Sequence, residues 1–379
     1  MAPNVTPTTP IEALTDTPVA VDPGAIESEF TRIWQETANT GIESSSVRLR
    51  LLNFIGVARS TSDLERFERV MAALPERHPC RGILAMVSPD AAEVTAAISA
   101  HCWRSPAGSR HVCSEEVLLR CGPGRERLLV SAVLALLVPE LPVTAWLIGD
   151  VGLEDGMVTE LLDSADRIFI DSTRASDPRA VMRAAVHAHE AHEIEVCDLA
   201  WCRLKSWRGL VAQFFDSAEG ARELSELSAI EVWSDTARPT GETLLLAGWL
   251  VSRLGLSIAD LKSAPGTIEG TLYDGSRGVK LTIAGRGDGG IPLQSVRLLT
   301  MNAAFLVEVH EASGHMHVRE DWRDAPVRRT VAHLASDDAS VFAEALTDDD
   351  DPKVFFAALQ SALLLLGDQE LTGSPARPS

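Results

Sequence analysis

The sequence predicts an α/β N-terminal domain with a largely parallel sheet, followed by an α+β C-terminal domain with an antiparallel sheet. Apolar strand-like runs alternate with helical patterns as far as Asp216, which is typical of a parallel sheet. From Thr267 onward, short alternating segments are separated by turns that contain glycine, which is typical of antiparallel hairpins. The 379 residues also exceed the roughly 100–200 residues that are usual for one domain.

Changes in composition divide the chain into four predicted ranges. Residues 1–24 are rich in Pro and Thr and are predicted to be a disordered arm, and residues 372–379 are predicted to be a disordered tail. Between them, 25–222 is the predicted α/β domain and 223–371 is the predicted α+β domain. The polar segment Ser217–Ser225 is the predicted linker.

Apolar periodicity and capping residues predict the elements of the first domain. Val47–Ala58 is apolar almost throughout, which suggests a strand buried on both faces. Ser60 with Asp63 resembles a capping box in which Asp replaces Glu, so a helix is expected to begin there. The other predicted elements, in order, are helix Ala25–Thr37, strands Gly82–Val87, Ala92–Trp103 and His111–Cys121, helix Arg125–Val138, strand Val143–Ile148, helix Met157–Asp163, strand Arg167–Asp171 and helix Pro178–His189.

The second domain is predicted from strand alternation and turn residues. An antiparallel sheet is expected over Thr267–Arg319, with turns at Asp274-Gly275, Gly285–Gly290 and Ser313-Gly314. Its other predicted elements are strand Ala229–Ser234, helix Glu242–Leu254, strand Val327–Leu334 and two final helices. Asp351 as cap and Pro352 at the first helical position mark the start of the last helix.

Charge and hydropathy exclude two classes of partner. The formal net charge of −20 opposes binding to nucleic acid and to anionic membranes, which need basic patches. The longest apolar run, Leu128–Pro139, has about half the length that a membrane-spanning helix requires. Because Met1–Pro23 lacks the features of a signal peptide, we expect a cytoplasmic protein.

The six cysteines are expected to be reduced and to pack as small apolar residues. They are Cys80, Cys102, Cys113, Cys121, Cys197 and Cys202. None lies in a Cys-x-x-Cys motif, so no redox pair or zinc knuckle is predicted.

Motifs for cofactors, metals and catalysis are weak. Gly285–Gly290 formally matches a dinucleotide fingerprint, but a strand follows it where a helix would be needed, so a hairpin turn is predicted. His189 and His192 lie in the densest group of possible metal ligands, which also contains His187, Glu190, Glu193 and Glu195, yet their i, i+3 spacing does not match a zinc helix. No nucleophile elbow is present, although a triad assembled by the fold stays open. We therefore predict no catalytic residues, no cofactor and no metal.

Asp198–Asp216 is the stretch with the most distinctive composition. Ser206 is a candidate N-cap, and the residues after it place apolar side chains at i, i+3, i+4, i+7 and i+8, which predicts a helix with one apolar stripe: Trp207, Leu210, Val211, Phe214 and Phe215. Tryptophan and arginine are enriched at protein–protein hot spots. Core packing is the alternative for Trp201 and Trp207, whereas Arg203 and Arg208 are less easily buried.

This stretch also carries a family resemblance. From Asp198 to Phe215 it reads Asp-Leu-x-Trp-x-Arg-Leu-x-x-Trp-Arg-x-Leu-x-Ala-Gln-Phe-Phe, which resembles the signature of the glucose-6-phosphate dehydrogenase assembly protein family, OpcA. Weaker similarities occur in the expected order at 77–81, 113–116, 141–146, 165–172 and 246–250, so that the resemblance covers Val47 to Leu366.

The resemblance implies a non-catalytic protein that binds glucose-6-phosphate dehydrogenase and promotes its assembly or active form. NADP would then belong to the partner enzyme. We expect the candidate partner contacts to be Arg203, Arg208, Trp201, Trp207 and Arg81. Two alternatives stay open: a sugar-phosphate or nucleotide-binding sensor or enzyme at the carboxyl edge of the parallel sheet, which ligand protection would reveal, and a metal site at the histidines, which elemental analysis would reveal.

Overall fold

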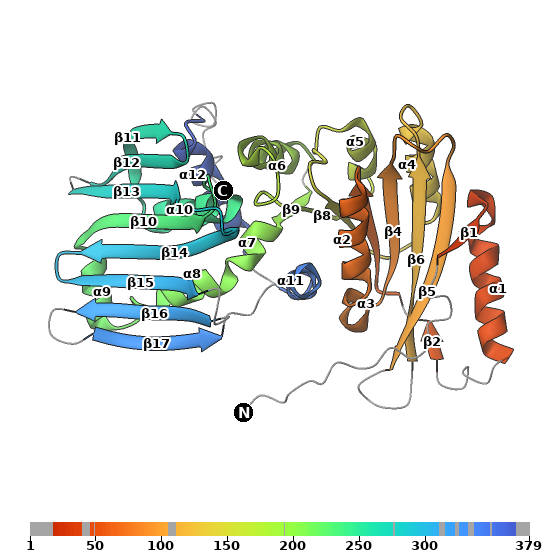
Figure 1. Ribbon diagram of the computed structural model, residues 1–379, viewed down its shortest axis with the longest axis horizontal. Helices are drawn as coiled ribbons and strands as arrows, with labels where there is room; N and C mark the ends of the chain where they lie inside the picture. The colour runs from red at the N-terminus through yellow and green to blue at the C-terminus, as the bar shows by residue number, and fades with distance from the viewer. Residues whose placement is uncertain are drawn as a thin grey trace. The chain divides into compact units, whose positions relative to one another are not determined.

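The computed structural model describes two compact units (Figure 1). The described residues are 18–39, 46–48, 50–104, 111–192, 194–275, 277–310, 315–322, 326–332, 337–348 and 351–368. Unit 1 is formed by segments within 1–170, 188–197 and 338–347, and unit 2 by segments within 171–187, 198–337 and 348–379. The chain therefore passes between the units several times, and this division does not coincide with the boundary predicted after residue 222.

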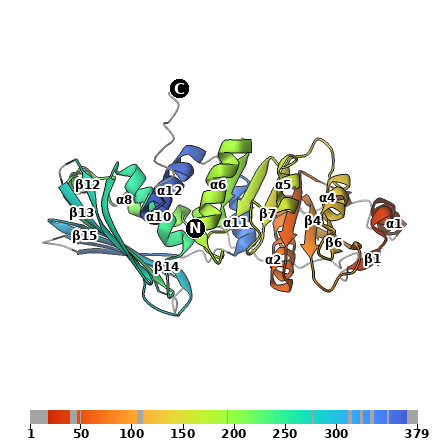
Figure 2. The ribbon, with the colours of Figure 1, turned by 90° about the horizontal axis from the view of Figure 1, so that it is seen from above.

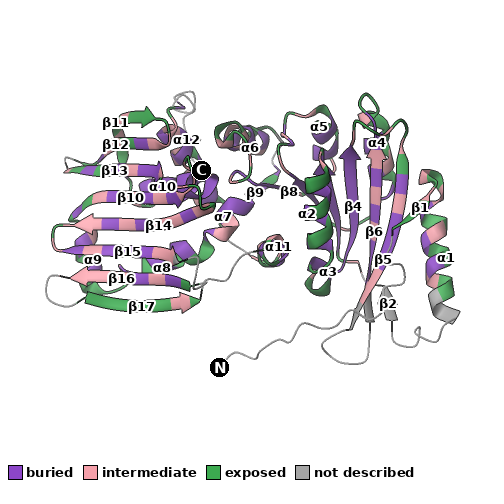
Figure 3. Ribbon diagram, viewed as in Figure 1, coloured by how far each residue is buried: buried purple, intermediate pink, exposed green. Residues whose placement is uncertain are grey.

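Unit 1 is built around a mostly parallel sheet with the strand order β1-β5-β6-β4-β3-β7-β8-β9, and β2 pairs with β6. The strands are β1 (Val19–Val21), β2 (Ser46–Arg48), β3 (Leu52–Ala58), β4 (Cys80–Val87), β5 (Thr95–Arg104), β6 (His111–Cys121), β7 (Val143–Leu147), β8 (Arg167–Ile170) and β9 (Glu195–Asp198). Every residue of β3 and β4 is buried, as Figure 3 shows for β4, which explains why their sequences are almost continuously apolar.

The helices of unit 1 come mostly from the segments between these strands, and α11 comes from a later part of the chain. They are α1 (Ile26–Asn39), which follows the short η1 (Pro23–Ala25), α2 (Thr61–Met71), α3 (Leu74–Arg77), α4 (Glu126–Ala135), α5 (Gly156–Leu162) and α11 (Asp338–Ala345), and α6 (Pro178–His192) runs from unit 2 into unit 1. Phe342 of α11 is fully buried, with its ring centroid 5.2 Å from that of Phe54 and 4.8 Å from those of Trp146 and Phe169. This aromatic cluster explains why a helix so late in the chain belongs to unit 1.

Several predictions for the first domain need correction. Val19–Val21 pairs with β5, so the end of the predicted arm is ordered. The predicted strand Val47–Ala58 is split, because Ser46–Arg48 pairs with β6 while Leu52–Ala58 pairs with β4 and β7. Residues 1–17 and 372–379 lie outside the described residues.

The prediction that all six cysteines are reduced is also wrong. Cys102 and Cys113 are bonded as a disulfide. They lie directly opposite each other on the consecutive strands β5 and β6, 11 residues apart in sequence, a pairing that cysteine spacing alone does not reveal. Among the described residues, Cys80, Cys121, Cys197 and Cys202 are free thiols.

Unit 2 contains an eight-stranded sheet in the order β11-β12-β13-β10-β14-β15-β16-β17. The strands are β10 (Leu227–Asp235), β11 (Ser257–Ala264), β12 (Thr267–Asp274), β13 (Arg277–Gly285), β14 (Ile291–Thr300), β15 (Ala303–His310), β16 (His315–Trp322) and β17 (Pro326–Ala332). β10 and β13 run parallel and the other described pairs run antiparallel, so the predicted antiparallel sheet is a mixed one.

The helices of unit 2 are α7 (Leu199–Arg203), α8 (Lys205–Gln213), α9 (Ala218–Leu224), α10 (Gly241–Arg253) and α12 (Pro352–Leu365). Figure 2 shows α8, α10 and α12 on one face of the sheet. The predicted linker at Ser217–Ser225 is instead α9, which Ser217 caps. Gly285–Gly290 is not a hairpin turn, because β10 lies between the two strands that this loop joins.

Candidate functional site

The carboxyl ends of β3 and β7 mark the place where the strand order of unit 1 reverses. From β3 the chain proceeds to β4 and β6 on one side and returns to β7, β8 and β9 on the other. In doubly wound sheets, a ligand binds in the crevice outside the carboxyl ends at this reversal, with its phosphates at a helix N-terminus. In this chain the helix that follows β3 is α2.

The N-terminus of α2 is occupied by the chain's own carboxylate. Oδ2 of Asp63 accepts from the backbone N–H of Ser60 at 3.0 Å and lies 3.3 Å from the backbone N of Arg59, and the predicted capping box with Ser60 is confirmed. Gly149, just after β7, has a φ of +68°, and a Cβ built there would lie 2.7 Å from Oδ1 of Asp63. The carboxylate thus lies in the crevice and takes donors that a nucleotide pyrophosphate would need.

A hollow of about 460 Å³ lies at the same edge of the sheet. Its lining residues are Arg59, Glu126, Arg127, Asp155, Gly156, Met157 and Glu160. Arg59 is paired with Asp155, and Arg127 lies 3.4 Å from Glu160. The hollow is thus lined by three carboxylates and by two guanidinium groups that already have partners. This excess of negative charge does not favour the binding of an anionic ligand.

The Asp198–Asp216 stretch forms α7 and α8. Asp198 caps α7 by accepting from the N–H of Ala200 at 2.9 Å, and α8 begins at Lys205 without a side-chain cap. The prediction that Ser206 is an N-cap is therefore wrong, because the chain is already helical before it. The predicted apolar stripe packs inward, with Phe214 against Phe305 of β15 at 5.2 Å between ring centroids.

The structure places the five candidate contact residues inside their own units. Trp201 is 7% exposed and Trp207 is 3% exposed. The guanidinium of Arg208 lies 3.6 Å from the centroid of the Trp201 ring and donates to the Trp201 carbonyl at 2.7 Å. Arg81 in unit 1 is 2% exposed and bonds to Glu115 at 2.7 Å. These contacts account for the four side chains as architecture, and their contact with another protein stays a prediction.

Arg203, the fifth candidate, is the centre of a buried carboxylate cluster in unit 2. It forms a two-point ion pair with Asp171 and lies 3.7 Å from Glu242. Burial raises the pKa of Glu242 to about 7 although Arg203 opposes this shift. Burial, together with the charge of Asp171, raises the pKa of Asp198 to about 6. Asp171, which pairs with Arg203, also lies 3.5 Å from Arg174. The raised pKa values mean that Asp198 and Glu242 bind protons more readily than ordinary carboxyl groups do.

Sequence reasoning missed this cluster. Asp171 directly follows β8 and Asp198 ends β9, and the carboxyl ends of neighbouring parallel strands meet at one edge. That position was a usable signal for two of the acids. Glu242, at the start of α10, gave no local signal, because its approach to Arg203 depends on the packing of α10 on α7.

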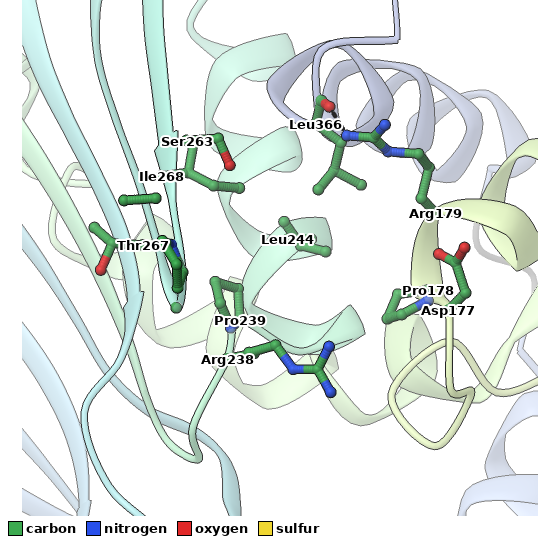
Figure 4. A pocket seen from close by; sticks show the side chains of 13 residues that line it. Asp177, Pro178, Arg179, Arg238, Pro239, Leu244, Ser263, Thr267, Ile268 and Leu366 are labelled. Carbon is green, nitrogen blue, oxygen red and sulfur yellow. Dashed lines mark hydrogen bonds between the residues drawn. The ribbon is translucent and has the colours of Figure 1, made fainter.

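A second hollow, also of about 460 Å³, lies within unit 2 (Figure 4). Arg179 at the start of α6 and Arg238 in the loop before α10 line it, together with Asp177 and apolar side chains that include Pro239, Leu244 and Ile268. Arg179 also donates to the carbonyl of Leu366. Two arginines beside an apolar wall suit a small molecule with one anionic group, and the volume lies within the usual range of ligand pockets.

The histidine group does not form a metal site among the residues that the structure describes. Nδ1 of His189 lies 3.1 Å from the carbonyl oxygen of Ile194, and no group of three possible ligands was found in the described part of the chain. The His192 side chain and Glu193 lie outside the description. Within the same residues, no helix is long and apolar enough to cross a membrane.

Comparison with known families gives two matches along the chain. Residues 71–186 match the OpcA family described as the N-terminal domain of the glucose-6-phosphate dehydrogenase subunit. Residues 194–359 match the OpcA family described as the C-terminal domain of the same protein. The two matched ranges lie side by side in sequence and cover most of the chain.

Curated relatives carry the same name. The "Putative OxPP cycle protein OpcA" of Synechocystis is 28% identical over 197 residues, which are 51% of this chain and 40% of that protein. The protein of this title in Nostoc punctiforme is 27% identical over 188 residues, 49% of this chain and 40% of that protein. The matched part thus spans about 40% of the length of these relatives.

Two of the solved structures that match this chain share little sequence identity with it. The aldose-aldose oxidoreductase from Caulobacter crescentus has a TM-score of 0.49 at 9% identity, over 85% of this chain and 98% of that chain. The UDP-N-acetylglucosamine 3-dehydrogenase from Acidithiobacillus ferrooxidans has a TM-score of 0.45 at 12% identity, over 84% and 99%.

Proposed function

The chain belongs to the OpcA family, and from this premise we propose that it is a non-catalytic protein that binds glucose-6-phosphate dehydrogenase and promotes its active form. In this role it supports the oxidative pentose phosphate pathway. The family descriptions name that dehydrogenase, and the relatives' titles name the OxPP cycle.

One observation carries the non-catalytic part of the proposal. The strand order of unit 1 creates the crevice in which doubly wound proteins bind nucleotides, yet the Asp63 carboxylate caps the adjoining helix and faces Gly149. A phosphate placed there would meet a negative charge and would compete with Asp63 for the N–H of Ser60. This supports a chain that leaves NADP to its partner.

Activation follows from linkage. A binding protein raises the population of an enzyme's active state only by binding that state more tightly than the inactive one, and such couplings are typically about 1–3 kcal/mol. By reciprocity, ligands that favour the active dehydrogenase should tighten its complex with this chain by the same factor.

The test mixes the purified chain with the dehydrogenase of the same organism. We expect the two proteins to co-elute in size-exclusion chromatography and the dehydrogenase rate to rise in a saturable way with added chain. The chain alone should not reduce NADP with glucose 6-phosphate. Absence of both co-elution and any kinetic change would contradict the proposal, and turnover by the isolated chain would contradict its non-catalytic part.

The predicted contacts are tested in the same assay. The double variant Arg203→Ala/Arg208→Ala removes two buried guanidinium groups, so its fold is first checked by circular dichroism. Full activation by a folded double variant would assign both side chains to architecture. Arg32→Ala is the matched control, because this guanidinium is half exposed on α1 of unit 1 and pairs with its neighbours on the same helix.

A second candidate function, sensing of a small anionic metabolite, is favoured by the hollow with Arg179 and Arg238. Calorimetric titration of the isolated chain with glucose 6-phosphate and with NADP distinguishes the two. Saturable binding that Arg238→Ala weakens at least about tenfold would support a sensor. No heat from either compound would leave dehydrogenase binding as the function.

A further inference from the structure

One face of the unit 2 sheet carries no helix among the described residues. α8, α10 and α12 lie on the opposite face (Figure 2). Along β10, Ile230 and Val232 are fully buried on that helical side, whereas Glu231 and Trp233, which alternate with them, are partly exposed. We call the side of the sheet that bears Glu231 and Trp233 the open face.

Strand register places a row of charged side chains across the middle of the open face. In the row through Glu231, the charged members are Lys262, Glu269 and Glu231 on β11, β12 and β10, and Arg297, Arg319 and Arg328 on β14, β16 and β17. The two acids therefore lie on one side of the boundary between β10 and β14, and the three arginines lie on the other.

This pattern is complementary to itself. Four strands lie on each side of the boundary between β10 and β14. If two copies pack face to face about a twofold axis that runs along the strands at this boundary, β10 of one copy lies opposite β14 of the other. In the same way, β12 of one copy lies opposite β16 of the other. Glu231, which lies 3.8 Å from Arg297 of its own chain, would then also face Arg297 of the second copy. Glu269 would face Arg319 of the second copy, which is also paired with Asp321 of its own chain, and each contact would occur twice by symmetry. A twofold axis across the strands would instead place Arg319 opposite Arg319, which like-charge repulsion disfavours.

The rows on either side fit the same arrangement. With the axis along the strands, Ala229 meets Leu299 of the second copy, and Trp233 meets Ser295. Eight strands about 4.8 Å apart, with three rows of side chains, cover about 750 Å², which is close to the roughly 800 Å² that each partner contributes to a stable interface. The charged row thus crosses the middle of the contact, and the small or apolar side chains lie in the rows on either side of it.

We propose that the open face binds the same face of a second copy of this chain, forming an isologous dimer through unit 2. This proposal does not depend on dehydrogenase binding, so the two proposals are tested separately and failure of one does not imply failure of the other. The charge pairs set the orientation of the two sheets, and the aligned packing of twisted sheets allows the central contacts to form.

The experiment uses two charge-reversal variants, one for the arginines of the row and one for its acids. One full-length variant carries Arg297→Glu and Arg319→Glu, and the other carries Glu231→Lys and Glu269→Lys. Sedimentation velocity of the unmodified chain should show a species of twice the 40.8 kDa chain mass. Each variant alone should dimerise at least about tenfold more weakly, because it places like charges opposite each other. Mixing the two variants should restore a dimer, which native mass spectrometry should identify as the heterodimer.

A third variant tests the proposed orientation of the two sheets by removing a like-charge contact and leaving the opposite-charge pairs intact. Lys262 would face Arg328 of the second copy at the rim, so Lys262→Glu should tighten the dimer by about two- to fivefold. The control Arg32→Glu, in unit 1, should leave the dimer constant unchanged. A chain that stays monomeric at all concentrations, a dimer that both double variants leave intact, or a mixture of folded variants that remains monomeric would each overturn the proposal.

Discussion

Arg203 and Asp171 form a buried two-point ion pair, with Nη1 3.0 Å from Oδ1 and Nη2 2.9 Å from Oδ2. Asp171 is 4% exposed, and the side chain of Arg203 is 9% exposed. Arg203 lies within the stretch that resembles the family signature most clearly, and Asp171 lies within one of the weaker similarities, at 165–172. Its geometry shows that a signature arginine has a structural role in its own chain, whatever else it contacts.

Arg203→Ala should lower the free energy of unfolding by about 3–5 kcal/mol, because it leaves the buried carboxylate of Asp171 without its main partner. Urea denaturation at pH 7.5 measures this change. The matched control is Arg174→Ala. The Arg174 side chain is 55% exposed and lies 3.5 Å from the same carboxylate, so its loss should cost less than about 1 kcal/mol. Equal costs for the two variants would contradict a dominant role for the buried pair.

Stability should fall between about pH 4 and pH 7 because of Asp198 and Glu242. Their folded-state pKa values, about 6 and about 7, lie above the ordinary values of 3.8 and 4.5. The folded chain therefore binds these protons more tightly, and the stability present below the ordinary pKa values is lost as the pH rises through the folded ones. Asp198→Asn and Glu242→Gln cannot ionise, so each should gain about 2–3 kcal/mol relative to the unmodified chain across this window. Parallel pH profiles of variant and unmodified chain would refute the assignment.

Asp63→Ala should destabilise the chain by about 1–2 kcal/mol, because the N–H of Ser60 loses its acceptor and the capping box of α2 is lost. Thermal unfolding followed by circular dichroism reports the change. Thr61→Ala, at an exposed position in the same turn, should stay within about 0.5 kcal/mol. If Asp63→Ala were neutral, the N-terminus of α2 would not hold the carboxylate, and Asp63 would not close the crevice.

Gly248→Ala should destabilise unit 2 by at least about 1–3 kcal/mol. A Cβ at this position of α10 would lie 2.2 Å from the carbonyl oxygen of Ala358 on α12, and backbone atoms cannot yield cheaply. Gly209→Ala in α8 is the control, since a Cβ there meets open space and should add about 0.5–1 kcal/mol of stability. In the same denaturation assay, the two variants should change the free energy of unfolding in opposite directions. A Gly248→Ala variant that is more stable than the unmodified chain would show that α10 and α12 lie farther apart than the 2.2 Å contact implies.

Local pattern determined much of the fold. The capping box of Ser60 and Asp63, the cap at Asp351 and the stripe from Trp207 to Phe214 each depend on residues within two turns of a helix, and each is confirmed. The α/β pattern followed by hairpins was enough to predict a mostly parallel sheet and a mostly antiparallel one. The family was also visible in the sequence, because its signature is a continuous stretch.

Tertiary structure decided which of these elements are neighbours and what their side chains contact. Arg203 contacts Asp171 and Glu242. Cys102 is bonded to Cys113 on the neighbouring strand. Phe342 packs against Phe54 and Trp146, which lie far earlier in the chain. The physical reason is that periodicity reports which face of an element is apolar but carries no information about the partner that covers it. The partner is selected by strand register and by the cost of burying charge, and both depend on residues far away in the chain.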